Sequence, residues 1–144
     1  IHKVTGLPTL SDDGGMEIDA LSGEPGVKSR RWRGYEMSDR EMIDYTLERL
    51  AGVPREKRTC RLKVVLCCIM PGKNPIFSDG SIEGIMTEKQ ETPIIMGFPF
   101  RSIMLIPQFN KMYSDLTEGE HHALNQRLIA LNKLRVQLGF KPQT

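Results

Sequence analysis

The stretch that most limits the fold is "CRLKVVLCCIM", residues 60–70. Its first half alternates charged and apolar residues, and its second half is wholly apolar. Alternation is typical of a half-exposed strand, whereas a short continuous apolar run is typical of a strand buried in a core. The stretch therefore predicts one long strand that enters the core of a sheet. Other extended segments are predicted at 8–10, 16–21, 76–77, 81–87, 94–96 and 103–106.

Two helices are predicted from capping boxes, in which a Ser or Thr precedes a Glu by three residues. Ser38 and Glu41 predict a helix over 39–51. Thr117 and Glu120 predict a second helix, which carries leucines at helical spacing until Gly139. "PGKN" (71–74) predicts a turn, and "SDG" (78–80) predicts a hairpin. Strands mixed with helices indicate an α/β or α+β domain with a mixed sheet.

The composition narrows the class of protein. The chain has 144 residues, of which 39% are hydrophobic and 26% charged, which suits one soluble globular domain. A net charge of +2 gives no electrostatic reason to expect nucleic acid, and no apolar run approaches the roughly 18–20 residues that span a bilayer. The three cysteines have no zinc-site spacing, so we expect reduced, buried thiols in a cytoplasmic protein without nucleic-acid or membrane partners.

Asp12 and Asp13 precede two glycines in "LSDDGG". Asp and Gly are common in surface turns, because the Asp side chain binds nearby backbone and Gly accepts positive φ. The same residues suit Mg²⁺ and phosphate chemistry, because carboxylates bind that cation and glycine lets phosphates approach the backbone. If the segment is extended, Asp13 points to the face of Glu17 and Asp19, and Asp12 points to the opposite face.

Three further groups have both a structural and a functional interpretation. The basic loop "SRRWR" (29–33) is either solvated or a phosphate-binding loop. Arg127 falls within a leucine stripe, so it either pairs with Glu120, extends its head to water, or points into a ligand cleft. His121 and His122 are expected at the surface, because no third metal ligand stands at suitable spacing.

The motifs together resemble one family, the inosine/xanthosine triphosphate pyrophosphatases. That family's pattern is A-D-D-S-G-L-x-V-D-A-L-x-G-x-P-G-v-y-S-A-R. The positions here that match it in register are Asp12, Asp13, Gly15, Asp19, Ala20, Leu21, Gly23, Pro25, Gly26, Ser29 and Arg31. Fainter matches follow at 83–85, 97–111 and 116–131. The resemblance spans the chain but leaves the family's opening section, a phosphate-binding strand and helix, without a counterpart.

The resemblance implies a single domain over 1–144. Its fold would be α/β, with a mixed, largely antiparallel, long-stranded sheet flanked by helices. The implied activity is Mg²⁺-dependent hydrolysis of ITP, dITP and XTP to monophosphate and pyrophosphate, by a homodimer. Asp13 would be catalytic, and Asp12 and Asp13 would bind the metal. The implied substrate-binding residues are Gly14, Ser29, Arg31, Phe98, Arg101, His121 and Arg127.

Several positions depart from the family pattern. Gly14 stands where the family has Ser, and His121 where it has Lys. Arg101 and Ser102 replace the Asp-Pro of the base pocket, which reverses the charge there. Two alternatives therefore remain: a pyrophosphatase with altered base specificity, and a catalytically inactive nucleotide-binding or dimerisation homologue.

Overall fold

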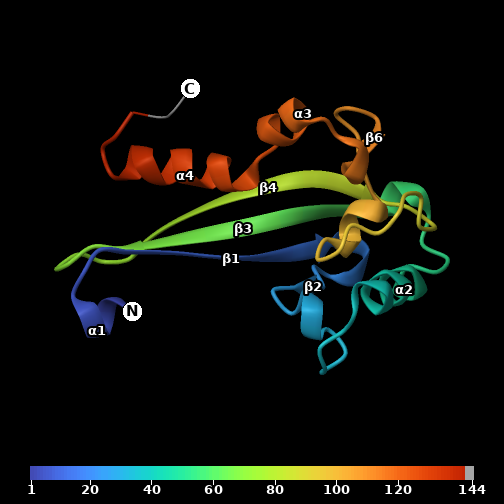
Figure 1. The fold of residues 1–144 in the computed structure, drawn as a ribbon, viewed down its shortest axis with the longest axis horizontal. Coiled ribbons are helices and arrows are strands. Elements are labelled where there is room, and N and C mark those ends of the chain that lie inside the picture. Colours follow the sequence, from blue (N-terminus) through green and yellow to red (C-terminus); the bar gives the residue numbers. More distant parts are fainter. Residues whose placement is uncertain (142–144) are drawn as a thin grey trace.

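The fold is built on one sheet of three long and three short strands (Figure 1). The computed structural model describes residues 1–141, so the last three residues of the predicted domain lie outside it. The strand order is β2-β1-β3-β4-β5-β6, and each neighbouring pair is antiparallel. The long strands are β1 (Thr9–Ile18), β3 (Thr59–Ile69) and β4 (Ile76–Met86). The short ones are β2 (Pro25–Gly26), β5 (Met104–Ile106) and β6 (Lys111–Met112).

The predicted α/β class and the long central strand are confirmed, but "LSDDGG" is not a turn. Strand β1 continues through both glycines and pairs with β3 over its whole length. A Cβ on Gly15 would collide with the backbone of Gly26 in β2, and one on Gly14 would collide with the carbonyl of Lys63 in β3. The two glycines therefore serve close approach of neighbouring backbones rather than a reversal of the chain.

Two other predictions are wrong, the hairpin at "SDG" and the strand at 94–96. "SDG" lies inside β4, and the reversal between β3 and β4 falls at the predicted "PGKN" turn. Gly80 of "SDG" is needed because a Cβ there would collide with the backbone carbonyl of Gln126. Residues 94–96 form no strand, and the chain instead turns where the Phe98 N–H donates to the Ile95 carbonyl at 2.9 Å.

Within residues 1–141 the α-helices are α1 (His2–Thr5), α2 (Asp39–Arg49), α3 (Glu118–Ala123) and α4 (Gln126–Gln137). Both predicted capping boxes are present, at Ser38 and at Thr117. The single helix predicted after Thr117 is two, because the Asn125 side chain accepts from the Arg127 and Leu128 N–H groups and starts α4 afresh.

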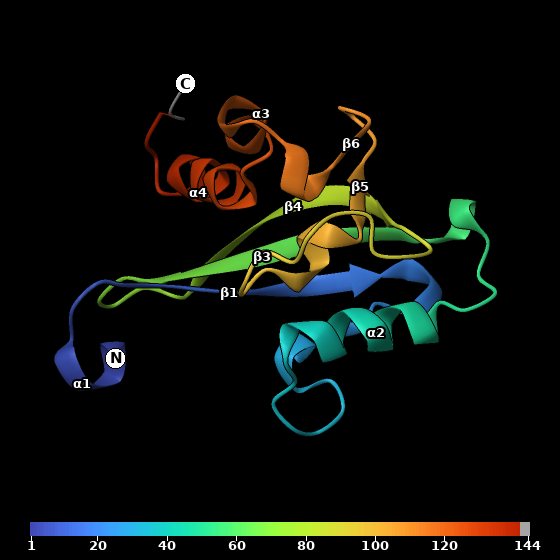
Figure 2. The same ribbon diagram turned by 45° about the vertical axis from the view of Figure 1, so that its right-hand side comes forward.

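Helices α2 and α4 lie over different ends of the long strands, α4 beside β4 and α2 beside β1 (Figure 2). The strand register places both on one face of the sheet. The core under α2 includes Ile18 and Cys60, and the core under α4 includes Val64 and Leu66. These are even-numbered positions of paired strands, so their side chains share one face. The two helices thus leave the middle of that face between them.

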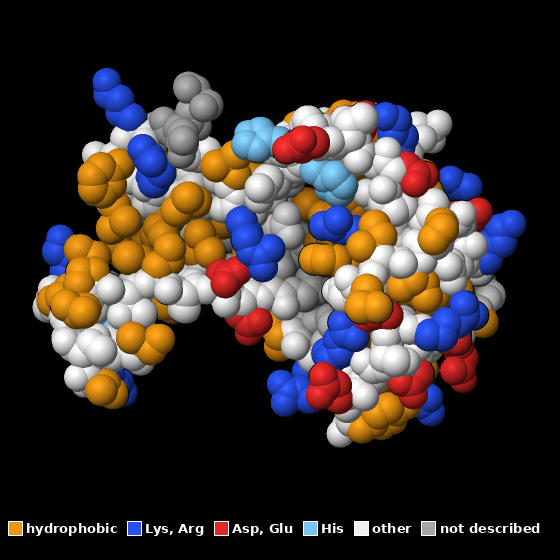
Figure 3. All heavy atoms as spheres, viewed as in Figure 1, with side chains coloured by type: hydrophobic (Ala, Val, Ile, Leu, Met, Phe, Trp, Pro, Cys, Tyr) orange, Lys and Arg blue, Asp and Glu red, His pale blue; other side chains and the backbone are white. Residues whose placement is uncertain are grey.

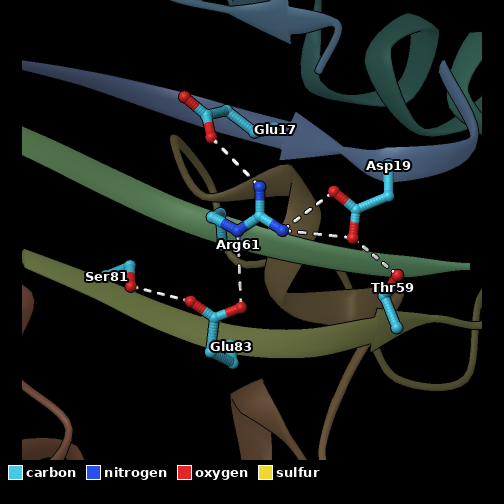
Figure 4. Close-up of polar contacts among 6 residues, drawn as sticks. All are labelled: Glu17, Asp19, Thr59, Arg61, Ser81 and Glu83. Carbon is cyan, nitrogen blue, oxygen red and sulfur yellow. Dashed lines mark hydrogen bonds and ion pairs between the residues drawn. The ribbon is translucent and has the colours of Figure 1, made fainter. Parts of the chain in front are cut away.

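The opposite face of the sheet carries charged side chains from the odd-numbered positions. Arg61, near the start of β3, contacts Glu17 at 3.3 Å, Asp19 at 2.8 Å and Glu83 at 3.4 Å (Figure 4). The Thr59 hydroxyl also donates to Asp19 at 2.6 Å, and this hydrogen bond is the largest influence holding the Asp19 pKa below its ordinary value. The network joins three adjacent strands on the face away from α2 and α4. Within residues 1–141 no helix is long and apolar enough to cross a membrane.

Candidate active site

A cavity of about 520 Å³ occupies the middle of the helical face. This volume falls in the usual range for small-molecule sites. Strands β1 and β3 form its floor, α2 bounds it on one side, and α3 with the start of α4 bounds it on the other. Figure 3 shows the molecule hollowed near its centre, with Lys, Arg and His side chains around the hollow. The predicted site residues among its lining are Gly14, Ser29, Phe98, Arg101, His121 and Arg127.

An ion pair at the rim of this cavity joins two segments that are far apart in the sequence. Arg127 Nε lies 2.8 Å from Asp12 Oδ2, across 115 residues of sequence. Both side chains are substantially exposed, at 65% and 44%. The alternative pairing of Arg127 with Glu120 is wrong, because Glu120 pairs with Lys111 at 2.7 Å. Because a new helix starts after Asn125, Glu120 and Arg127 belong to different helices rather than to the single helix on which their pairing was predicted.

Asp13 lies on the other face of the sheet from Asp12, as the strand alternation predicts. Its Oδ1 accepts from the Gly14 N–H at 2.8 Å, and it does not line the cavity. The two carboxylates therefore do not converge on one point. Among the described residues no group of three or more His, Cys, Asp or Glu side chains converges either. Since Mg²⁺ is often held by one or two carboxylates together with substrate phosphates, the donor set fits such an ion only through a single carboxylate, that of Asp12.

The basic loop contributes a different arginine from the predicted one. Ser29 lies beside β1 and β2: its hydroxyl donates to the Gly26 carbonyl of β2 at 2.6 Å and accepts from the Met16 N–H of β1 at 3.5 Å. Ser29 also lines the cavity. Arg30 lines the cavity as well, whereas Arg31 is exposed and outside it. The short 3₁₀ turn Ser29–Arg31 accounts for this, because neighbouring side chains on such a turn point in different directions.

Asp39 connects two segments that line the cavity, the loop that carries Arg30 and the loop at Gly97. The sequence did not predict this role. Asp39 Oδ1 accepts from Arg30 at 2.6 Å, and its Oδ2 accepts from the Gly97 N–H at 2.6 Å. Burial acts to raise the Asp39 pKa, but the Gly97 N–H and the Arg30 charge outweigh it and hold that pKa below its ordinary value. The only sequence signal was its place after the Ser38 cap, which assigns it to a helix start and says nothing of a cavity.

Aromatic rings and cations form another part of the cavity wall. The Arg101 guanidinium carbon lies 4.3 Å from the centre of the Phe98 ring and 4.9 Å from that of the Tyr113 ring. Tyr113 is buried, while Phe98 is 53% exposed. The His121 ring lies 5.1 Å from that of Tyr113. Burial and the nearby Arg101 charge lower the pKa of His121, while Glu120 acts in the opposite direction. His121 is thus part of the cavity and only half-buried, not a plain surface residue.

Two segments that are distant in sequence thus meet in one hollow: the "DDGG" strand with its following loop, and the region from Gly97 to Arg127. A planar ring could lie against Phe98, and anionic groups could meet Arg127, Arg30 and the Ser29 hydroxyl. Tyr113 and Asn125 also line the cavity and were missed. For Asn125 a signal existed, because Asn directly before a helical run is a common N-cap.

The chain is similar to known proteins over most of its length. The family model described as "Ham1 family" matches residues 1–137. A protein of Shouchella clausii named dITP/XTP pyrophosphatase is 39% identical over 126 residues, 88% of this chain and 63% of its own. One of Bacillus licheniformis with the same name is 33% identical over 96% of this chain and 69% of its own. The chain thus spans somewhat less than two thirds of the first of these relatives.

Solved structures give the same result. The Staphylococcus aureus Ham1 protein superposes with a TM-score of 0.83 at 26% identity, over 95% of this chain and 69% of that one. A HAM1 protein from Coxiella burnetii superposes with a TM-score of 0.80 at 30% identity, over 94% and 68%. These findings confirm the resemblance drawn from "DDGG" and the motifs after it: the chain belongs to the Ham1 family.

Proposed function

We propose that the protein hydrolyses the non-canonical purine nucleotides ITP, dITP and XTP to the monophosphate and pyrophosphate, with Mg²⁺ as cofactor. The observation that carries this proposal is the cavity of about 520 Å³, whose lining residue Arg127 pairs at the rim with Asp12 of the "DDGG" strand. The names of the Shouchella and Bacillus relatives support the same substrate class.

In the proposed complex the purine lies against Phe98, whose ring is half-exposed. The phosphates extend toward Arg127, Ser29 and the Gly14 backbone, where charge-assisted hydrogen bonds hold them. Asp12 would provide the carboxylate for Mg²⁺, which neutralises phosphate charge when bound. Release of Asp12 from Arg127 would then free that guanidinium for a phosphate oxygen.

Hydrolysis needs a water molecule that attacks the α-phosphorus while the bond to the bridging oxygen of pyrophosphate breaks. We propose that Asp13 orients this water or takes its proton, in keeping with the place of Asp13 in the motif. General-base action requires hydrogen-bond reach to the water. Asp13 points away from the cavity, and this observation favours a second candidate: a nucleotide-binding homologue without hydrolysis.

One experiment separates the candidates. The full-length protein would be incubated with Mg²⁺ and with ITP, dITP, XTP, ATP or GTP, and pyrophosphate release would be measured. The proposal predicts release from the first three, and a fall of about 100-fold or more on Asp13→Asn. The matched control is Asp79→Asn, an exposed aspartate on β4 outside the cavity lining, which should leave the rate unchanged.

Two outcomes would contradict the proposed activity, and a third would contradict the proposed role of Asp13. Release from none of the nucleotides, in the presence of measurable nucleotide binding, would establish the second candidate. Release from ATP or GTP alone would replace the substrate class. An unchanged rate in Asp13→Asn, with a loss in Asp12→Asn, would move the catalytic assignment to the carboxylate on the cavity face.

The proposal also covers assembly and location. A single domain over 1–144 is supported by the continuous sheet. A homodimer is supported by the exposed apolar residues Val65 and Phe77, which lie on the face of the sheet away from α2 and α4. A cytoplasmic location is supported by three cysteines that are all unpaired thiols.

A further inference from the structure

We propose that Arg101 makes the cavity selective for an anionic purine base, so that xanthine nucleotides bind more tightly than hypoxanthine nucleotides. This inference rests on the proposed function, in which the cavity takes a purine nucleotide. It adds a ranking within that substrate class and assigns the ranking to one side chain.

The Arg101 guanidinium is positioned by two aromatic rings. Its carbon lies over the rings of both Phe98 and Tyr113, at 4.3 and 4.9 Å from their centres. Stacking on aromatic faces fixes the plane of a guanidinium and leaves the N–H groups at its edge available. Within residues 1–141 Arg101 has no ion pair with a carboxylate, so its charge is not neutralised locally.

The other charged residues that line the cavity do not neutralise Arg101. No Asp or Glu is among the lining residues. Arg30 and Arg127 line the cavity too, but each has a carboxylate partner, Asp39 at 2.6 Å and Asp12 at 2.8 Å. Lys63 is an odd-numbered position of β3, so its side chain points to the opposite face of the sheet.

Two side chains from neighbouring elements lie next to Arg101. His121 approaches from α3, and Tyr113 from the 3₁₀ turn before it. The His121 pKa is lowered, first by burial and then by the Arg101 charge. The imidazole is therefore neutral at pH 8, and Arg101 remains the uncompensated positive charge beside Phe98.

The xanthine and hypoxanthine bases differ in charge. The xanthine ring is a weak acid that has lost a proton at pH 8, so it carries a negative charge. Hypoxanthine is neutral at that pH. Both nucleotides carry the same ribose and phosphates, so the cations at the phosphate end cannot distinguish them. A planar guanidinium at the base can, because hydrogen bonds to an ionised acceptor are stronger than those to a neutral one.

The test is binding of the product monophosphates XMP and IMP at pH 8, measured by isothermal titration calorimetry on the full-length protein. XMP should bind more tightly than IMP. In Arg101→Gln the ratio of the two affinities should fall by roughly five- to tenfold, mostly through weaker XMP binding. Arg101→Lys, which keeps the charge, should retain part of the preference.

Arg33→Gln is the matched control. Arg33 also lies over an aromatic ring, at 5.1 Å from the centre of Tyr45, but it is exposed and outside the cavity. This variant should keep the wild-type ratio. Circular dichroism of each variant confirms that it is folded, so that a lost preference is not lost structure.

Equal binding of XMP and IMP by the wild type would overturn the inference. So would an equal loss of both ligands in Arg101→Gln, because that result would assign Arg101 to the phosphates or to a shared edge of the purine. Because the measurement involves no hydrolysis, it remains informative if the pyrophosphatase activity is absent. A protein that hydrolyses ITP and XTP yet shows no Arg101-dependent ratio would retain the proposed function and lose this inference.

Discussion

At the residue scale, His121 couples the cavity to pH. Its pKa in the folded chain is below the ordinary value of 6.5, because burial and Arg101 disfavour the imidazolium. The unfolded chain therefore binds more protons than the folded one between the lowered pKa and 6.5. The stabilisation that comes from a neutral His121 is complete above pH 6.5 and is lost as the pH falls through the folded pKa.

Replacement of His121 by Gln should make stability less sensitive to acid. Between pH 7 and pH 5 the free energy of unfolding should fall less steeply in His121→Gln than in the wild type. Urea unfolding at a series of pH values measures this slope. His122→Gln, at the exposed neighbouring residue, is the control and should keep the wild-type slope. An identical slope in His121→Gln and wild type would show that the fold does not shift this pKa.

At the element scale, the position of α4 depends on Gly80 in β4. A Cβ at Gly80 would collide with the Gln126 carbonyl and would approach the Ala130 nitrogen to 3.1 Å. These are backbone atoms of α4, so a methyl group can be accommodated only if the helix moves. Such a movement would carry Arg127 away from Asp12, and with it one rim of the cavity.

Gly80→Ala should therefore destabilise the protein by about 1–3 kcal/mol, the usual cost of overpacking. It should also weaken IMP binding. Gly119→Ala in α3 is the control, because a Cβ there meets no atom within 4 Å and alanine is the better helix former by about 1 kcal/mol. The midpoints of urea unfolding would measure both effects. A Gly80→Ala protein as stable as the wild type would mean that α4 is not seated on this glycine.

The close backbone contacts at glycines such as Gly80 also separate the elements that the sequence could predict from those that it could not. The long strand at 60–70 and both capping boxes were recognised, because side-chain alternation and caps are local signals. The hairpin predicted at "SDG" and the turn considered for "DDGG" are absent, since glycine permits both chain reversal and close packing, and only the partner backbones decide which. Gly15 faces Gly26, and Gly80 faces Gln126. Those partners lie 11 and 46 residues away.

The site could be predicted in part for a similar reason. The family resemblance predicted Ser29, Phe98, Arg101 and Arg127 as substrate-binding residues, and all four line the cavity. It could not show that Arg30 rather than Arg31 enters, because that depends on the phase of one 3₁₀ turn.

At the scale of the whole molecule, Arg58 connects the end of α2 with the end of β4. It is only 4% exposed, and its guanidinium donates to the carbonyls of Leu50, Val53 and Thr87 at 2.7–2.9 Å. Leu50 caps the C-terminal end of α2, where the helix dipole favours a cation. In the sequence Arg58 ends a charged, loop-like run, "REKR", so nothing local marks it as buried.

Arg58→Met should destabilise the protein by about 3–4 kcal/mol, because three buried or half-buried carbonyls lose their donor at once. Arg55→Met, which removes an exposed arginine three residues earlier, should change stability by about 0.5 kcal/mol or less. Denaturant unfolding of both variants measures the difference. Equal, small losses in the two would mean that α2 is held to the sheet by its apolar face alone. A large loss confined to Arg58→Met would show that one buried cation holds the α2 side of the cavity to the rest of the molecule.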